Sequence, residues 1–120
     1  MDLIEEQLRN SKTIALVGLS DNPARDSHRV AKYMQSQGYR IIPVNPMITG
    51  ALGEKSYPDL KSVPEPIDMV DIFRRSEFVP PVVDEAIDVG AKYIWMQDGV
   101  VHPEAAAKAE QAGIPVVMND

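Results

Sequence analysis

No cysteine occurs among the 120 residues of the chain, and this absence excludes several chemistries at once. A chain without thiols forms no disulfide, holds no iron–sulfur cluster and has no cysteine nucleophile. Histidine is nearly as scarce: His28 and His102 are the only two, so no histidine-based metal site is expected. Basic residues are outnumbered as well. The net charge of -6 argues against broad binding to nucleic acid or to an anionic membrane surface.

Long apolar runs are missing too. The N-terminal residues 1–6 are acidic, with interrupted apolar positions, and match neither a signal peptide nor a membrane-spanning helix, which predicts a cytoplasmic protein. Hydrophobic residues make up 44% and charged residues 25% of the chain, values typical of a folded globular protein. At this length we expect a single domain over residues 1–120 with a core of its own.

What the sequence does contain is a regular alternation of two patterns. Apolar runs typical of strands lie at 13–17, 40–45, 67–73, 92–97 and 114–118, and helical patterns begin near residues 3, 27, 80 and 103. Pro43 cannot donate a backbone hydrogen bond, so the second strand is expected to be irregular or partly unpaired. The alternation predicts an α/β fold, a doubly wound parallel five-stranded sheet of order 3-2-1-4-5 with helices on both faces.

Residues 18–29 carry the clearest functional signal. An apolar strand ends at Gly18, turn-forming residues follow, and Ser27 is placed to cap the next helix. Loops of this kind hold phosphate in α/β proteins, because the first N–H groups of the helix have no partner within it and point at the anion. A plain turn and helix cap is the alternative, but it would not require the basic side chains that gather here. The residues expected around the anion are Gly18, Ser20, Arg25, Ser27 and His28.

The ends of the other predicted strands supply further polar and aromatic groups. Asn45 follows the second strand, where an NAD-binding domain usually carries a carboxylate for the ribose hydroxyl. A carboxylate there would repel a ribose phosphate and an amide would accept it, although Asn45 and Pro46 also suit a plain turn. Phe73 and Arg74 follow the third strand, and Gln97 follows the fourth.

No catalytic constellation emerges. The sequence has no Walker lysine loop and no G-x-S-x-G elbow, and Ser20, Asp26 and His28 are too crowded around one helix start to form a hydrolytic triad. The loop reads G-x-S-x-x-P instead of the G-x-G-x-x-G of dinucleotide-binding domains. We therefore expect a nucleotide-binding protein without catalytic activity of its own. An NAD(P)-binding oxidoreductase-type module and an interaction module with a vestigial nucleotide site are the alternatives.

An ordered set of short motifs resembles a known family, the stand-alone bacterial CoA-binding proteins. These proteins are similar to the CoA-binding N-terminal domain of the succinyl-CoA synthetase alpha subunit. The resemblance extends over roughly residues 8–118, and its motifs are IALVGLS at 14–20, RxSxxV at 25–30, PVNP at 43–46, YPxL at 57–60, DIFR at 71–74 and WMQxGV at 95–100.

The resemblance implies a Rossmann-like fold and coenzyme A or acyl-CoA as the ligand. It places Gly18, Leu19 and Ser20 on the phosphates, with Arg25 and Ser27 closing that loop. It further places Asn45, Pro46 and Tyr57 toward the adenosine, Phe73 and Arg74 beside the nucleotide, and Gln97 toward the pantetheine arm. Coenzyme A carries a phosphate on its ribose, which agrees with the amide at Asn45. A protein partner is possible, and the sequence does not identify one.

Overall fold

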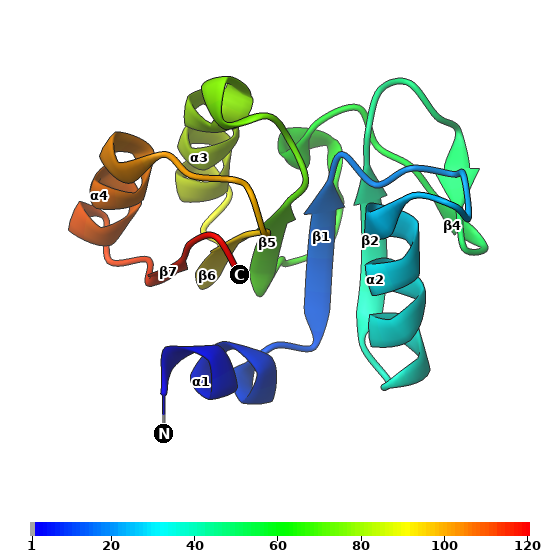
Figure 1. Ribbon diagram of the computed structural model, residues 1–120, viewed down its shortest axis with the longest axis horizontal. Helices are drawn as coiled ribbons and strands as arrows, with labels where there is room; N and C mark the ends of the chain where they lie inside the picture. The colour runs from blue at the N-terminus through cyan, green and yellow to red at the C-terminus, as the bar shows by residue number, and fades with distance from the viewer. Residues whose placement is uncertain (1) are drawn as a thin grey trace.

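The computed structural model describes residues 2–120, so that Met1 of the predicted domain lies outside the described residues. A five-stranded sheet forms the centre of the fold, and a two-stranded hairpin lies beside it (Figure 1). The helices are α1 (Leu3–Asn10), α2 (Asp26–Ser36), α3 (Val79–Asp88) and α4 (Pro103–Gln111). The strands of the sheet are β1 (Thr13–Val17), β2 (Arg40–Val44), β5 (Met69–Ile72), β6 (Tyr93–Met96) and β7 (Val116–Val117). The hairpin consists of β3 (Gly50–Ala51) and β4 (Glu54–Lys55), and the short 3-10 turns are η1 (Leu60–Ser62) and η2 (Ser76–Phe78).

The five strands are parallel, and their order is β2-β1-β5-β6-β7. The predicted order 3-2-1-4-5 is therefore wrong, because the third predicted strand, β5, pairs with β1 and not with β2. One carboxylate fixes that pairing: Asp68 Oδ2, just before β5, accepts hydrogen bonds from the backbone N–H groups of Lys12 (2.8 Å) and Thr13 (3.0 Å) at the start of β1. β2 is left at the edge of the sheet, where Pro43 is tolerated without a donor.

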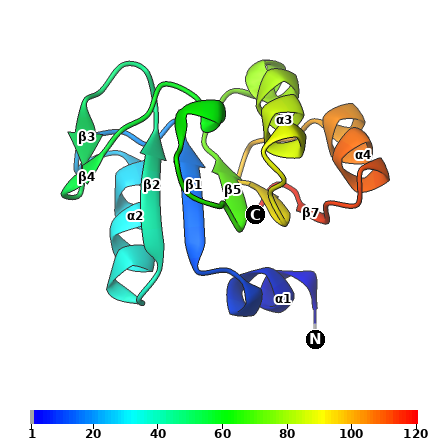
Figure 2. The same cartoon turned by 180° about the vertical axis from the view of Figure 1, so that it is seen from behind.

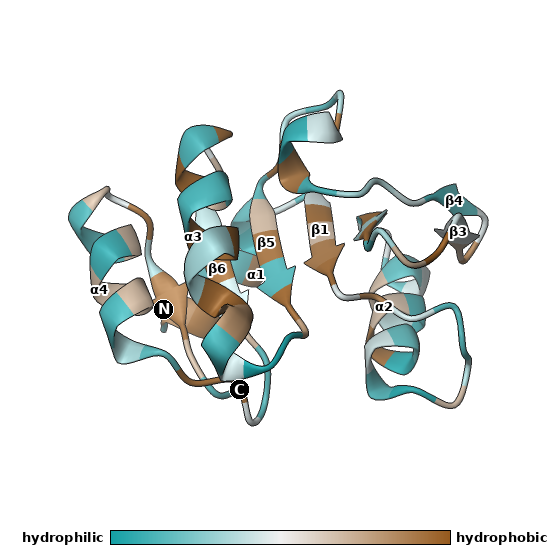
Figure 3. Cartoon of the chain, turned by 90° about the horizontal axis from the view of Figure 1, so that it is seen from above, coloured by the Kyte–Doolittle hydropathy of each residue, from teal (hydrophilic) through white to brown (hydrophobic). Residues whose placement is uncertain are grey.

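Helices cover both faces of the sheet, as predicted. Alternate residues of a strand point to opposite faces, so β1 contributes to two separate apolar clusters. Ala15 and Val17 pack under α3 and α4, whereas Ile14 and Leu16 pack on the side of α1 and α2. Figures 1 and 2 show the two sides, and in Figure 3 the strands are mostly hydrophobic while hydrophilic residues gather on helices and loops.

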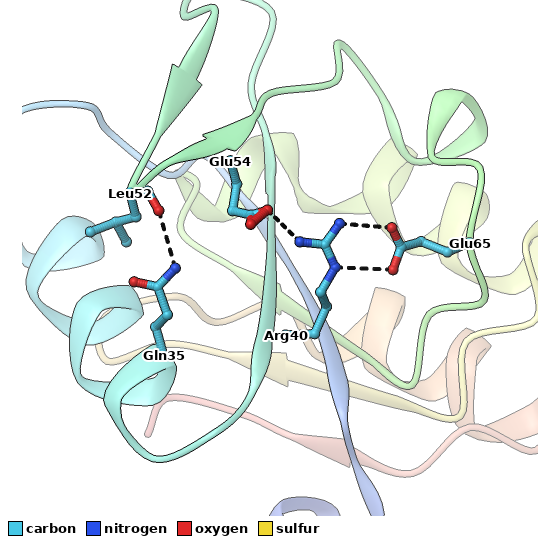
Figure 4. Close-up of polar contacts among 5 residues, drawn as sticks. All are labelled: Gln35, Arg40, Leu52, Glu54 and Glu65. Atoms are coloured by element: carbon cyan, nitrogen blue, oxygen red, sulfur yellow. Dashed lines mark hydrogen bonds and ion pairs between the residues drawn. The ribbon is translucent and has the colours of Figure 1, made fainter.

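The outer edge of β2 is covered by the segment that contains the hairpin. Tyr57 donates its N–H to Pro43 O (3.0 Å), and the N–H of Asn45 donates to Tyr57 O (2.8 Å). At the other end of β2, Arg40 forms a two-pronged ion pair with Glu65 and a second ion pair with Glu54 of β4 (Figure 4). These contacts hold the hairpin segment against an otherwise open strand edge. The sequence predicted an irregular excursion here, and the hairpin within it was missed.

Among residues 2–120, no helix is both long enough and apolar enough to cross a lipid bilayer.

Candidate functional site

A cleft of about 830 Å³ opens at the carboxyl edge of the sheet. Its walls come from the loop between β1 and α2, the first turns of α2, the residue after β5 and the loop after β6. This position coincides with the switch point of the topology, because the chain leaves β1 for β2 on one side and later returns to β5 on the other. The lining residues are Gly18, Ser20, Ala24, Arg25, Asp26, Ser27, Arg29, Val30, Phe73, Gln97, Asp98 and Val100.

The loop between β1 and α2 is held in shape by its own side chains. Ser27 Oγ accepts a hydrogen bond from the N–H of Ser20 (3.0 Å), and Ser20 Oγ accepts one from the N–H of Asn22 (3.0 Å). Asn22 Oδ1 in turn accepts from the N–H of Ala24 (3.0 Å). Among residues 2–120, each of these two hydroxyls acts only as an acceptor. The hydroxyl hydrogens of Ser20 and Ser27 are therefore available to donate to a ligand in the cleft.

The start of α2 adds backbone donors to the same wall. Ser27 was predicted as the residue that caps this helix, but α2 begins one residue earlier, with Arg25 in the cap position and Ser27 inside the first turn. The serine hydroxyl ties the helix start to the loop, and so its role is to shape the loop rather than to cap the helix. The first N–H groups of this 11-residue helix have no intrahelical partner and carry the positive end of the helix dipole.

Two arginines reach the cleft, and they differ in how they are bound. Arg29 donates to the carbonyl oxygen of Ala24 (2.8 Å) and forms an ion pair with Asp26, so that it braces the loop. The exposed side chain of Arg25 makes no hydrogen bond or ion pair with any of residues 2–120. Arg25 is consequently the guanidinium that can give its full set of donors to an anion.

At the β6 end of the cleft, an amide side chain bonds to a buried carboxyl group. Gln97 follows β6 and donates from Nε2 to Oδ1 of Asp71 on β5 (2.7 Å). Asp71 as a residue is 4% exposed, and the burial of its carboxyl group raises the pKa to about 7, against the smaller opposing effect of the Gln97 hydrogen bond. A buried carboxyl group needs a hydrogen-bond partner, and Gln97 supplies it.

Half of the residues predicted for the site lie together in the cleft. They are Gly18, Ser20, Arg25, Ser27, Phe73 and Gln97. Of the remainder, Leu19 is fully buried in the cluster under α2, and His28 is buried in the first turns of that helix. Pro46, Tyr57 and Arg74 lie outside the lining, and the Tyr57 ring faces Lys55, whose Nζ is 5.2 Å from the ring centroid.

Asn45 also lies outside the lining, in a position that supports the loop. Its Nδ2 donates to the carbonyl oxygen of Leu19 (3.0 Å), and its Oδ1 accepts from the N–H of Met47 (2.9 Å). The amide thus connects the end of β2 to the loop after β1. A carboxylate at this position has no hydrogen to donate and could not make the bond to Leu19.

Sequence reasoning did not single out six of the lining residues as site residues: Ala24, Asp26, Arg29, Val30, Asp98 and Val100. Local sequence patterns could have identified most of them. Val30 follows Asp26 and Ser27 at helical spacing and therefore shares their face of α2. Asp98 and Val100 follow Gln97 in the loop after a predicted strand. No group of three or more histidine or acidic side chains among residues 2–120 is arranged to hold a metal ion.

Comparison with known proteins identifies relatives along nearly the whole chain. The uncharacterized protein YneT of Bacillus subtilis (strain 168) is 49% identical over 97% of this chain and 86% of that protein. A solved structure of a hypothetical protein from Pyrococcus horikoshii OT3 superimposes with a TM-score of 0.93 at 41% identity, over 97% of this chain and 82% of the other.

A more distant relative is an enzyme subunit. The alpha subunit of ADP-forming acetate–CoA ligase I from Pyrococcus furiosus is 32% identical over 74% of this chain. The match spans 21% of the length of that subunit. The family model for a CoA binding domain matches residues 12–120, and the chain therefore belongs to the CoA binding domain family.

Proposed function

We propose that this protein binds coenzyme A or an acyl-CoA in the cleft at the carboxyl edge of its sheet, without catalytic activity of its own. The observation that carries the proposal is the set of uncommitted donors in the loop between β1 and α2. The hydroxyls of Ser20 and Ser27, the guanidinium of Arg25 and the start of α2 converge on one wall. Such a wall suits a phosphate or pyrophosphate group.

The size of the cleft supports a ligand larger than a phosphate ion. A volume of about 830 Å³ lies within the range of cofactor-binding clefts, whereas one anion fills only a small part of it. Membership of the CoA binding domain family favours coenzyme A among the nucleotides that carry a pyrophosphate. The missing second and third glycines of the dinucleotide motif count against NAD. A cytoplasmic location stays a prediction.

Titration calorimetry with coenzyme A, acetyl-CoA, dephospho-CoA and NAD tests this proposal. We expect coenzyme A and acetyl-CoA to bind, and NAD to bind at least about tenfold more weakly, a difference of about 1.4 kcal/mol. Dephospho-CoA should bind more weakly than coenzyme A because it lacks the ribose phosphate. The proposal fails if NAD binds as tightly as coenzyme A, or if none of the CoA compounds binds.

A double substitution, Ser20→Ala with Ser27→Ala, tests whether binding uses this wall of the cleft. The variant loses both hydroxyl donors and also the two backbone hydrogen bonds that the serine oxygens accept within the loop, so the affinity for coenzyme A should fall. Ser62→Ala is the matched control, because the exposed Ser62 hydroxyl of η1 donates to Asp59, which caps η1 away from the cleft. Equal affinity in the wild type and the double variant would place the phosphates elsewhere.

A further inference from the structure

The buried carboxyl group of Asp71 lies directly beneath the β6 end of the cleft. In the sheet, Asp71 is in register with Leu16 of β1 and Trp95 of β6. Because alternate residues share a face, Asp71 and Phe73 project from the same side of β5, and Trp95 and Gln97 from the same side of β6. Phe73 and Gln97 line the cleft, and Asp71 is one step deeper in the sheet.

Among residues 2–120, Gln97 is the only hydrogen-bond partner of the Asp71 side chain. An ionised carboxylate can only accept hydrogen bonds, so the amide of Gln97 must turn its N–H group toward Asp71. The amide oxygen of Gln97 then points away from Asp71, and no hydrogen bond within the described residues occupies it. Because Gln97 lines the cleft, this free oxygen is placed to accept a hydrogen bond from a ligand there.

We propose that Asp71 is a positioning residue that fixes the Gln97 amide and thereby makes the β6 end of the cleft select a ligand group that donates a hydrogen bond. The inference rests on the proposed function of the cleft. Two strand spacings separate β6 from β1, roughly 10 Å, so the group lies on the part of the ligand beyond the phosphates. An amide N–H or a thiol S–H has the required chemistry.

Because of this geometry, the ligand group that Gln97 favours depends on whether Asp71 is protonated. A protonated carboxyl group has an O–H that can donate to the oxygen of Gln97, and the amide then rotates and turns its N–H group into the cleft. Burial raises the pKa of Asp71 to about 7, so both arrangements are accessible near neutral pH. Above the pKa the cleft presents an acceptor, and below the pKa it presents a donor.

No charged neighbour accounts for the titration of Asp71. Burial and the hydrogen bond from Gln97 are the causes of the shift. β1 and β6 place the uncharged Leu16 and Trp95 beside Asp71, and the cluster on this face is apolar or aromatic. The ionisable groups on the elements around this face are Glu5, Glu6 and Arg9 on α1, Arg25, Asp26, His28, Arg29, Lys32 and Tyr33 on α2 and its cap, Asp98 after β6, Asp120 at the chain end, and Tyr39 and Tyr93 in the cluster.

A measurement without ligand tests the positioning step by itself. We expect the side-chain amide signals of Gln97 in a nitrogen–proton NMR spectrum to shift with pH, with a midpoint near the pKa of Asp71. Asp71→Asn, which is neutral and nearly isosteric, should abolish that shift. Amide signals that do not move between pH 5.5 and 8.5, or that move equally in Asp71→Asn, would overturn the proposal whether or not coenzyme A binds.

Binding measured against pH tests the consequence for the ligand. The probe is dephospho-CoA, because the phosphate monoester of coenzyme A itself titrates near pH 6. Losing one hydrogen bond corresponds to about 3- to 10-fold in affinity, so wild-type binding should weaken by that factor from pH 8 to pH 5.5. Asp71→Asn and Gln97→Ala should both abolish this pH dependence of the affinity. Asp98→Asn, an acid-to-amide change in the same cleft, and His28→Gln should both retain it.

The outcomes separate the two proposals. If no CoA compound binds while the Gln97 signals titrate, the function proposed for the cleft fails and the Asp71–Gln97 switch stands. If dephospho-CoA binds and its pH dependence survives in both Asp71→Asn and Gln97→Ala, the function stands and the role of Asp71 is wrong.

Discussion

A Cβ atom added to Gly18 would lie 2.1 Å from the carbonyl oxygen of Phe73. The two residues follow β1 and β5, the neighbouring strands between which the cleft opens. Phe73 also donates its N–H to Val17 O (2.9 Å), immediately before Gly18, so the two strand ends are joined where they leave the sheet. Only glycine fits at this point, and its φ of +92° directs the chain into the loop that forms the proposed phosphate-binding wall.

Gly18→Ala should therefore destabilise the fold and weaken coenzyme A binding. We expect a loss of roughly 2–4 kcal/mol in the free energy of unfolding, because backbone strain and a clash with a main-chain atom act together. Gly38→Ala is the matched control: Gly38 has a φ of +94°, but nothing lies within 4 Å of its added Cβ. Urea denaturation of both variants separates the clash from the strain. Equal losses would mean that the contact with Phe73 relaxes freely.

Arg25→Ala should weaken coenzyme A binding with little change in stability, because the exposed Arg25 side chain makes no hydrogen bond or ion pair with any of residues 2–120. A hydrogen bond to a charged group contributes about 1.5–3 kcal/mol, which corresponds to about 10- to 150-fold in the dissociation constant. Arg75→Ala is the control, since Arg75 is exposed at the same edge of the sheet but does not line the cleft. Calorimetry that finds the two variants equal would remove Arg25 from the site.

Asn45→Asp should reduce the preference for coenzyme A over dephospho-CoA. The carboxylate would repel the ribose phosphate, and it would also lose the hydrogen bond to Leu19. Asn45→Ala is the matched variant, because it loses the same hydrogen bond without gaining a charge. We expect Asn45→Ala to weaken both ligands by the same factor and Asn45→Asp to weaken coenzyme A more. If the two variants behave alike, the ribose phosphate binds away from Asn45.

Asp71→Asn should stabilise the fold increasingly as the pH rises. The pKa of Asp71 is about 7 in the folded protein and its ordinary value is 3.8, so between these values the folded state holds a proton that the unfolded state has lost. The contribution of Asp71 to stability is thus lost as the pH rises from about 4 to about 7. The asparagine variant avoids this loss, which amounts to at most about 4 kcal/mol.

Denaturant unfolding at pH 4.5, 6 and 8 measures that effect. The variant and the wild type should be close in stability at pH 4.5, and the difference between their free energies of unfolding should increase toward pH 8. Asp98→Asn, an exposed acid two residues after β6, should show no such increase. A stability difference for Asp71→Asn that is the same at all three pH values would contradict the raised pKa.

The parts of the fold that depend on local pattern were predictable from the sequence. β1, the turn at Gly18 and the start of α2 within one residue all follow from apolar runs, turn residues and helix-start signals. The resulting loop supplied Gly18, Ser20, Arg25 and Ser27 to the predicted site, and all four line the cleft. The capping role predicted for Ser27 was wrong, because Arg25, two residues earlier, holds the cap position and the Ser27 hydroxyl bonds to Ser20 across the loop.

The parts that depend on contacts between distant segments were not predictable in the same way. The strand order depends on the pairing of β5 with β1, which Asp68 supports through bonds to residues more than 50 positions away, and no local pattern reveals such contacts. Pro43 did give a usable signal, because a strand that lacks a donor belongs at an edge. The role of Asn45 beside a ribose phosphate stays a prediction made from its chemistry, whereas its bond to Leu19 is visible only in the folded chain.

A crystal structure of the protein with coenzyme A tests the central claim most directly. It should show the phosphates within hydrogen-bonding distance of the Ser20 and Ser27 hydroxyls and of the Arg25 guanidinium, and the arm of the ligand directed toward Gln97. A structure in which this cleft stays empty, with coenzyme A bound elsewhere or absent at saturating concentration, would contradict the account.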